Sequence, residues 1–219
     1  MKDNKAGCVD AEGAEGQAAR QREELILGKP PRLEPLTSKD IIDAAVRSTQ
    51  EVRKAAGSST PVTAADVPEL MTTLLRHPDL YGRIADLSIQ LLGKGVLALR
   101  DRQLAILRVS WLCQAPYVWG EHVKHSKRIG LTSEEIERVT HGSTAAGWDE
   151  HERAILRAVE ELHEGAMIAD ATWEVLSKRL DERQLIELPV LVGQFTTVIY
   201  FQNALRLRLA PGNIGLRAR

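Results

Sequence analysis

Residues 104–113 read LAILRVSWLC, and among these side chains only Arg108 and Ser110 are polar. A helix that is apolar around its whole circumference is buried on all sides, so this stretch predicts the central helix of a core. We therefore expect Arg108 inside the fold or at a subunit contact. A buried guanidinium needs a carboxylate or carbonyl partner, because an unpaired charge costs several kcal/mol. The alternative for Arg108 is that it anchors an anionic substrate.

On both sides of this stretch the hydrophobic pattern is helical, and no segment alternates with the period of a strand. Thr132 to Glu135 form a capping box, and Gly130 is a typical residue just past a helix end. We predict an all-α fold with a single multi-helix domain. Starts and stops place helices at about residues 38–56, 68–76, 79–91, 101–113, 117–129, 132–141, 149–163, 170–180 and 181–205.

The first 30 residues differ from the rest. They contain Gly7, Gly13 and Gly16 and show no lasting helical periodicity. We expect residues 1–30 to be a flexible N-terminal arm, either a disordered extension or a strap over a neighbouring subunit. Residues 31–219 are then the helical domain.

Composition narrows the class of protein. The chain has 219 residues, which suits one domain, and its 29 Lys and Arg nearly balance its 30 Asp and Glu. The basic excess typical of nucleic-acid-binding proteins is therefore missing from the totals. Cys8 and Cys113 lie far apart and form no CxxC motif. A disulfide scaffold, a thiolate zinc site and a two-cysteine redox motif all lose support.

The sequence also argues against a membrane partner. The charged N-terminus lacks the apolar region of a secretory signal. The longest apolar stretch, residues 188–201, contains Pro189 and Gly193 and is too short to span a bilayer. We expect a cytoplasmic location.

Residues 117–125, YVWGEHVKH, hold the densest group of side chains suited to chemistry. Helical spacing places His122 on the inward stripe with Val118 and Ser126. An interior histidine near an aromatic wall is a candidate general acid, because its pKa lies near neutral pH. The alternative is a core histidine that is satisfied by a backbone carbonyl.

His125 stands three residues after His122, a spacing that can hold a metal ion. No further Glu or Cys stands at a telling spacing on another helix, so we predict no metal site. His125 is otherwise expected as a half-exposed polar residue.

Residues 102–122, RQLAILRVSWLCQAPYVWGEH, closely resemble the carboxymuconolactone decarboxylase family, whose members show R-E-x-x-I-L-R followed by Y-x-W-x-x-H. The resemblance continues at residues 130–132, 152–162, 171–173, 181–188 and 192–194, and covers roughly residues 30–216. It implies an all-α fold that assembles into trimers or hexamers. It also implies pockets between helices and partly between subunits.

The resemblance implies one of two chemistries. One branch of the family decarboxylates a carboxylated muconolactone without a metal or an organic cofactor. The other, alkylhydroperoxidase D-like branch reduces peroxides with a CxxC pair placed seven and four residues before the motif histidine. Here Ala115 and Val118 stand at those positions. Without sulfur there is no thiolate to reduce a peroxide, and Cys113 is alone, so peroxidase activity is disfavoured.

Three positions depart from the decarboxylase pattern. The family glutamate near the start of the motif helix is Gln103, which cannot exchange a proton. The glutamate often found before the motif tyrosine is Pro116, and the histidine often found in the last helix is Gln194. His122 remains, so a different substrate or a simpler reaction with one proton donor is expected.

The resulting hypothesis is a cofactor-independent lyase, a decarboxylase acting through an enolate on a small carboxylated lactone or related acid of aromatic catabolism. The alternatives are an isomerase or eliminating lyase on a similar acid, a metal-dependent enzyme that uses His122 and His125, and a non-catalytic family member that binds a small molecule. The expected catalytic residues are His122 as proton donor, Arg108 as anion anchor and Tyr117 as an oxyanion donor. The expected substrate-binding residues are Gln103, Trp111, Trp119, His125 and Gln194.

Overall fold

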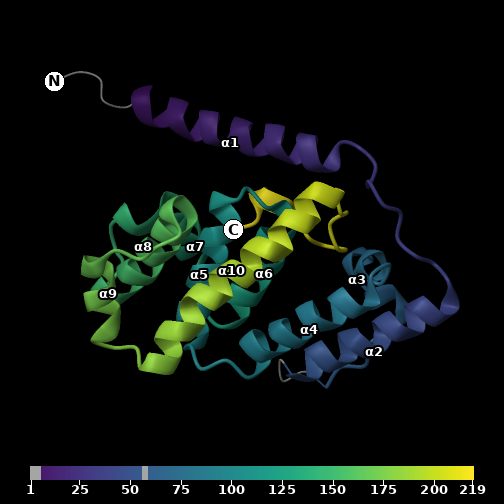
Figure 1. Cartoon of the computed structure of the whole chain (residues 1–219). Coiled ribbons are helices and arrows are strands. Elements are labelled where there is room, and N and C mark those ends of the chain that lie inside the picture. The colour runs from purple at the N-terminus through teal and green to yellow at the C-terminus, as the bar shows by residue number, and fades with distance from the viewer. Residues whose placement is uncertain (1–5, 56–58) are drawn as a thin grey trace.

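The computed structural model describes residues 6–55 and 59–219, and within these ranges it is helical with no strand (Figure 1). The all-α prediction is confirmed. The α-helices are α1 (Ala6–Leu27), α2 (Lys39–Ala55), α3 (Glu69–Leu74), α4 (Pro78–Gly93), α5 (Leu99–Leu112), α6 (Pro116–Arg128), α7 (Ser133–His141), α8 (Glu150–Gly165), α9 (Asp170–Ser177) and α10 (Glu182–Leu205). Three short 3₁₀ turns accompany them, η1 (Ala64–Asp66), η2 (Gly142–Thr144) and η3 (Gly215–Arg217).

The centre of the fold is α5, as its apolar sequence predicts. Every residue from Asp101 to Ser110 is buried. The helix packs against α6, α7, α8 and α10, and α10 crosses in front of it in the view of Figure 1. Because α5 has no solvent face over these residues, each polar side chain that it carries must find its partner inside the protein.

The helix starts follow from local capping chemistry. Thr132 accepts a hydrogen bond from Glu135 N, and the Glu135 carboxylate accepts one from Thr132 N, which confirms the predicted capping box of α7. Asp149 and Asp181 open α8 and α10 in the same way. These boxes satisfy backbone donors that would otherwise be unpaired in the first turn.

The N-terminal segment differs from its prediction, because residues 6–27 form α1 and not an arm without helical structure. In the view of Figure 1, α1 lies above the other helices, and its start is above α8. Its later half is held to the C-terminal segment, where Leu216 N donates to Glu23 Oε1 at 2.6 Å. Alanine, glutamate, glutamine and arginine favour a helix without forming an apolar stripe, so periodicity gave no signal.

The last long helix, α10, is the one described helix that is long and apolar enough to cross a membrane. This is weak evidence, because the core helix of a globular domain has the same composition. The inner face of α10 packs on α5 and α4, with Leu188, Leu191 and Phe195 buried.

Arg108 joins three elements. Its Nε donates to Glu160 Oε1 of α8 at 2.9 Å, and its Nη1 donates to the carbonyls of Val139 and Thr140 at 3.0 and 2.8 Å. The next turn approaches so closely that a Cβ at Gly142 would collide with both Arg108 and Glu160. Arg108 thus has the structural partners that its burial requires.

We predict that Arg108→Ala lowers the free energy of unfolding by about 3–5 kcal/mol, because it leaves the Glu160 carboxylate largely buried without its cation. Arg157→Ala is the matched control, since Arg157 approaches the same carboxylate at 3.7 Å from the surface. We expect the control to cost less than about 1 kcal/mol. Urea denaturation of both variants measures this, and equal losses would contradict the structural role of Arg108.

Candidate functional site

His122 is buried in α6, and its ring is oriented by Gln103 of α5. The distance from His122 Nδ1 to Gln103 Oε1 is 2.9 Å, and Ser126 Oγ donates to the same oxygen at 3.4 Å. Since this oxygen accepts both bonds, Nδ1 carries the proton and donates it to Gln103. The other ring nitrogen, Nε2, is then left as a proton acceptor.

The Nε2 side of the ring is available for chemistry. Within residues 6–55 and 59–219, Nε2 has no hydrogen-bond partner, and it is not sealed from solvent. Phe195 of α10 meets the ring edge-on, with centroids 5.0 Å apart and planes at 89°. The ring of His125 lies 5.5 Å away on the same helix. A buried imidazole with one reachable nitrogen is suited to proton transfer.

The electrostatic surroundings keep His122 neutral. Burial is the largest cause that lowers the pKa of His122 well below its usual value, and the charges of His125 and Arg102 lower it further. Partial desolvation of the His125 ring, followed by the charge of Arg128, likewise lowers the pKa of His125, which lies at the surface. At neutral pH the resting imidazole of His122 is therefore a base. For the predicted role of proton donor, His122 must first take up a proton before it can give one.

Arg102 is the site residue that sequence reasoning missed. It is 9% exposed, and its Nη1 donates to the carbonyls of Leu91 and Leu92 at 3.2 and 2.9 Å. Its charge acts on both site histidines. The available signal was its place next to Gln103 in a helix that is buried on all sides.

Arg108 is not part of this site. Its guanidinium is taken up by Glu160 and two backbone carbonyls on the α7–α8 side of α5. The prediction that Arg108 anchors an anion is therefore replaced by its alternative, a structural ion pair. The reason is geometric, since positions 103 and 108 point to different sides of one helix.

Tyr117 is buried, and no contact places its hydroxyl at the His122 ring among the described residues. Burial raises the pKa of Tyr117, with the charges of Glu121 and Glu69 adding to the effect. The phenol therefore stays protonated at neutral pH. The predicted role of Tyr117 as oxyanion donor in the His122 site has no support from this geometry.

Trp111 and Trp119 contact the C-terminal segment. Trp111 and Trp119 lie with ring centroids 4.9 Å apart, and Trp119 Nε1 donates to Ala218 O at 3.0 Å. The guanidinium of Arg219 lies 5.1 and 5.5 Å from the two ring centroids. Trp119 is fully buried, so the predicted aromatic wall of the site is instead an anchor for the chain end.

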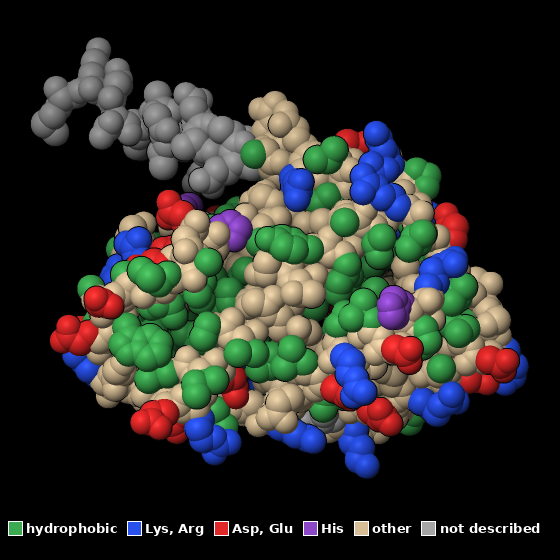
Figure 2. Space-filling model, viewed as in Figure 1, with side chains coloured by type: hydrophobic (Ala, Val, Ile, Leu, Met, Phe, Trp, Pro, Cys, Tyr) green, Lys and Arg blue, Asp and Glu red, His purple; other side chains and the backbone are tan. Residues whose placement is uncertain are grey.

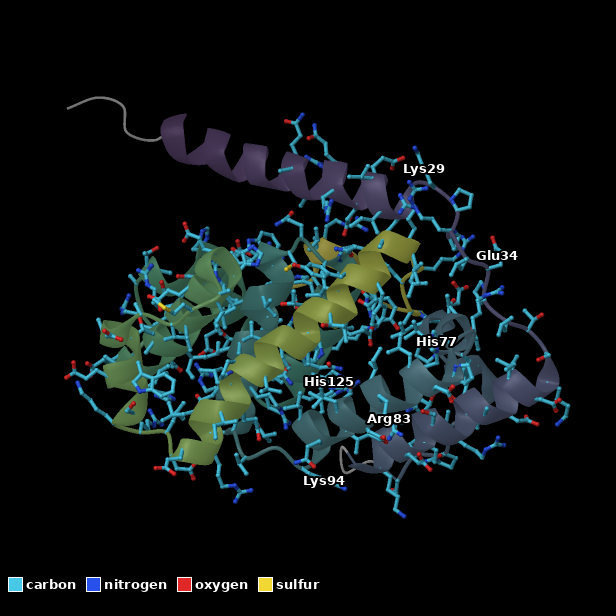
Figure 3. The ribbon with its side chains drawn as sticks, viewed as in Figure 1. Lys29, Glu34, His77, Arg83, Lys94 and His125 are labelled. Carbon is cyan, nitrogen blue, oxygen red and sulfur yellow. The ribbon has the colours of Figure 1, made fainter. Side chains whose placement is uncertain are left out.

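The structure places the predicted substrate-binding residues Gln194 and His125 in different surroundings. Gln194 of α10 is buried, and its Nε2 donates to Ser88 Oγ at 3.2 Å, which ties α10 to α4 and not to His122. His125 is exposed beside the site, and Figure 3 labels it between the ribbons of α10 and α4 in this view. No group of three or more His, Cys, Asp or Glu suited to a metal occurs in the described part of the chain.

The sequence profile of the carboxymuconolactone decarboxylase family matches residues 78–161, which span α4 to α8 and include Gln103 and His122. Over these residues the chain is similar to the carboxymuconolactone decarboxylase family. No curated protein sequence matches it.

Solved structures share the fold of this chain. An uncharacterized peroxidase-related protein from Silicibacter sp. TM1040 is 17% identical, with 84% of this chain and 94% of that chain covered at a TM-score of 0.67. A variant of the debrominase Bmp8 in complex with 2,3,4-tribromopyrrole is 14% identical in sequence. The match covers 82% of this chain and 91% of that chain at a TM-score of 0.66. A protein of unknown function from Agrobacterium tumefaciens, described as a candidate antioxidant defence protein AhpD, is 22% identical in sequence. The match covers 62% of this chain and 94% of that chain at a TM-score of 0.58.

In this chain, side chains without sulfur occupy the two positions where the peroxidase-like branch has its cysteines. Ala115 and Val118 are buried apolar side chains. The thiol of Cys113 lies 3.7 Å from His163 Nδ1, and burial raises its pKa. A raised pKa disfavours the thiolate that peroxide reduction requires.

We predict that Gln103→Glu raises the pKa of His122, because a carboxylate 2.9 Å from Nδ1 stabilises the imidazolium more strongly than the neutral amide does. A pH titration of the His122 ring protons by NMR measures this. Gln90→Glu on the exposed face of α4 is the control and should leave the His122 pKa unchanged. An unshifted pKa in a folded Gln103→Glu protein would contradict the contact.

Proposed function

We propose that the protein is a cofactor-independent enzyme that moves a proton on a small carboxylate-bearing acid, a carboxylated lactone or a related ring-derived acid, through an enolate. The observation that supports this is the buried, neutral His122 imidazole, with Nδ1 bonded to Gln103 and Nε2 free. A fixed neutral imidazole in a largely dry site is a base whose orientation needs no reorganisation.

The chemistry begins at Nε2. The imidazole takes a proton from a carbon next to a carbonyl, and the C–H electron pair moves into that carbonyl to form an enolate. Return of the proton from Nε2 to another carbon of the enolate completes an isomerisation. Breakage of a β C–O bond, with the lactone oxygen leaving, completes an elimination. The Gln103 amide accepts from Nδ1–H throughout and stabilises the imidazolium intermediate.

Decarboxylation is the second candidate, and the match of residues 78–161 to the carboxymuconolactone decarboxylase family model favours it. In an acid whose carboxylate lies β to a carbonyl, the bond between the α carbon and the carboxylate breaks, CO₂ leaves, and the electron pair moves into the carbonyl to form an enolate. The resulting carbanion then needs a proton, which His122 supplies only if it starts as the imidazolium. The lowered pKa of His122 is the reason that we place proton abstraction first.

Assembly into a trimer or hexamer remains part of the proposal. Ile186, Val190 and Tyr200 follow one another at helical spacing on the outer side of α10 and are exposed. Figure 2 shows that side chains over α10 are mostly hydrophobic or uncharged, whereas charged side chains gather nearer the edges of this face. An apolar stripe of this kind suits a contact between subunits. A cytoplasmic location stays a prediction.

We predict that His122→Gln lowers turnover of a processed acid by ~10²–10⁴, the usual effect of removing a general acid or base. The assay follows CO₂ release and the NMR spectrum of the product over a panel of carboxylated lactones and aromatic-catabolism acids. His141→Gln, exposed at the end of α7 and away from this ring, is the matched control and should change turnover far less. A folded His122→Gln protein with an unchanged rate would remove His122 from the mechanism.

The pH dependence separates the two candidates. A base must be unprotonated, so proton abstraction predicts that kcat/KM is flat near pH 7 and falls when acidification protonates Nε2 below the usual histidine pKa. Decarboxylation with imidazolium as donor predicts the opposite sign, a rate that rises on acidification. A kcat/KM that rises on acidification, together with release of CO₂, would contradict proton abstraction and favour decarboxylation.

A further inference from the structure

We propose that Arg102 is the anion-binding residue of this site, and that the free Nε–Nη2 edge of its guanidinium holds the carboxylate of the ligand beside His122. This inference rests on the proposed function for the identity of the ligand as a small acid. Arg102, and not Arg108, is then the residue that binds the anion, because Arg102 has guanidinium donors without a hydrogen-bond partner.

The donors of Arg102 are incompletely used. Its Nη1 is occupied by the carbonyls of Leu91 and Leu92 at the end of α4. Its Nε is buried with no hydrogen-bond partner, and its Nη2 makes no hydrogen bond within the described residues while remaining reachable by solvent. A buried N–H without a partner costs free energy, so a native protein seldom leaves one unless a ligand or water completes it.

The unused donors have the right arrangement for a carboxylate. Nε–H and one Nη2–H point in parallel from the same edge of the guanidinium, and this fork matches the two oxygens of a carboxylate. The bonds from Nη1 to the α4 carbonyls fix the plane of the group from the other edge. The guanidinium is therefore oriented before a ligand arrives, which lowers the entropy cost of binding.

No side chain of the described residues neutralises Arg102 directly. The other arginines of α5 have close ion pairs, Arg100 with Glu135 and Glu152 and Arg108 with Glu160. Glu187 lies near enough to act on the charge of Arg102, but its carboxylate accepts from Val96 N and Leu97 N at 2.8 and 3.1 Å. A buried cation without a paired anion favours an anionic ligand.

The position of Arg102 couples ligand binding to proton transfer. It precedes Gln103, the partner of His122, and its charge disfavours the imidazolium of His122. A bound carboxylate cancels that charge, so His122 becomes a stronger base when the acid is in place. The empty enzyme would keep a weak base, and the loaded enzyme a competent one.

The test measures binding of sodium benzoate, with benzamide as its uncharged analogue, by isothermal titration calorimetry. Arg102→Gln should weaken benzoate binding by about tenfold or more, because a charge-assisted bidentate contact is lost. Benzamide binding should not change. Arg83→Gln, on the exposed side of α4, is the matched control and should bind benzoate as the unsubstituted protein does.

A second readout needs no variant. In the unsubstituted protein, saturating benzoate should raise the pKa of His122 in an NMR titration, whereas benzamide should not. The proposal is overturned if benzoate fails to bind, if Arg102→Gln binds it equally well, or if the pKa of His122 does not rise. Benzoate that binds through Arg102, in a protein that turns over no acid, would contradict the proposed enzyme activity and leave the anion site standing.

Discussion

A helix that is buried on every side must find a partner for each polar side chain it carries, and α5 carries several between Asp101 and Ser110. Asp101 pairs with the buried His151 at 2.9 Å, Arg108 pairs with Glu160 at 2.9 Å, and Gln103 accepts from His122 at 2.9 Å. These contacts fix α8 and α6 against the central helix. The candidate site lies where the pairing is incomplete, at the free nitrogen of His122 and the free edge of Arg102.

Local signals predicted most of the fold. Thr132 with Glu135, and Asp149 and Asp181 at their helix starts, are capping residues whose effect depends only on neighbours in the chain. The burial of α5 follows from its apolar composition, and the inward position of His122 follows from helical spacing. The helix α1 was not predicted for the same reason, since a helix without an apolar stripe leaves no periodic signal in the sequence.

The site itself depended on contacts that no local pattern contains. Arg102 and Arg108 are the same residue type on one helix, and only the groups opposite them distinguish an open guanidinium from a closed ion pair. For Arg108 that group is Glu160, which is 52 residues away in the chain. In the same way Trp119 meets Ala218 across 99 residues. The sequence places these side chains inside the protein, but tertiary contacts decide which of them face each other.

The proposed chemistry depends on the protonation state of the His122 imidazole. Gln103 in place of a carboxylate, burial, and the charge of Arg102 together hold His122 neutral with its proton on Nδ1. The most direct measurement is a ¹⁵N NMR spectrum of the histidine rings at pH 7, with His122 assigned by its substitution. We expect a neutral His122 with a protonated Nδ1 and an unprotonated Nε2. An imidazolium, or a neutral ring with the proton on Nε2, would contradict it.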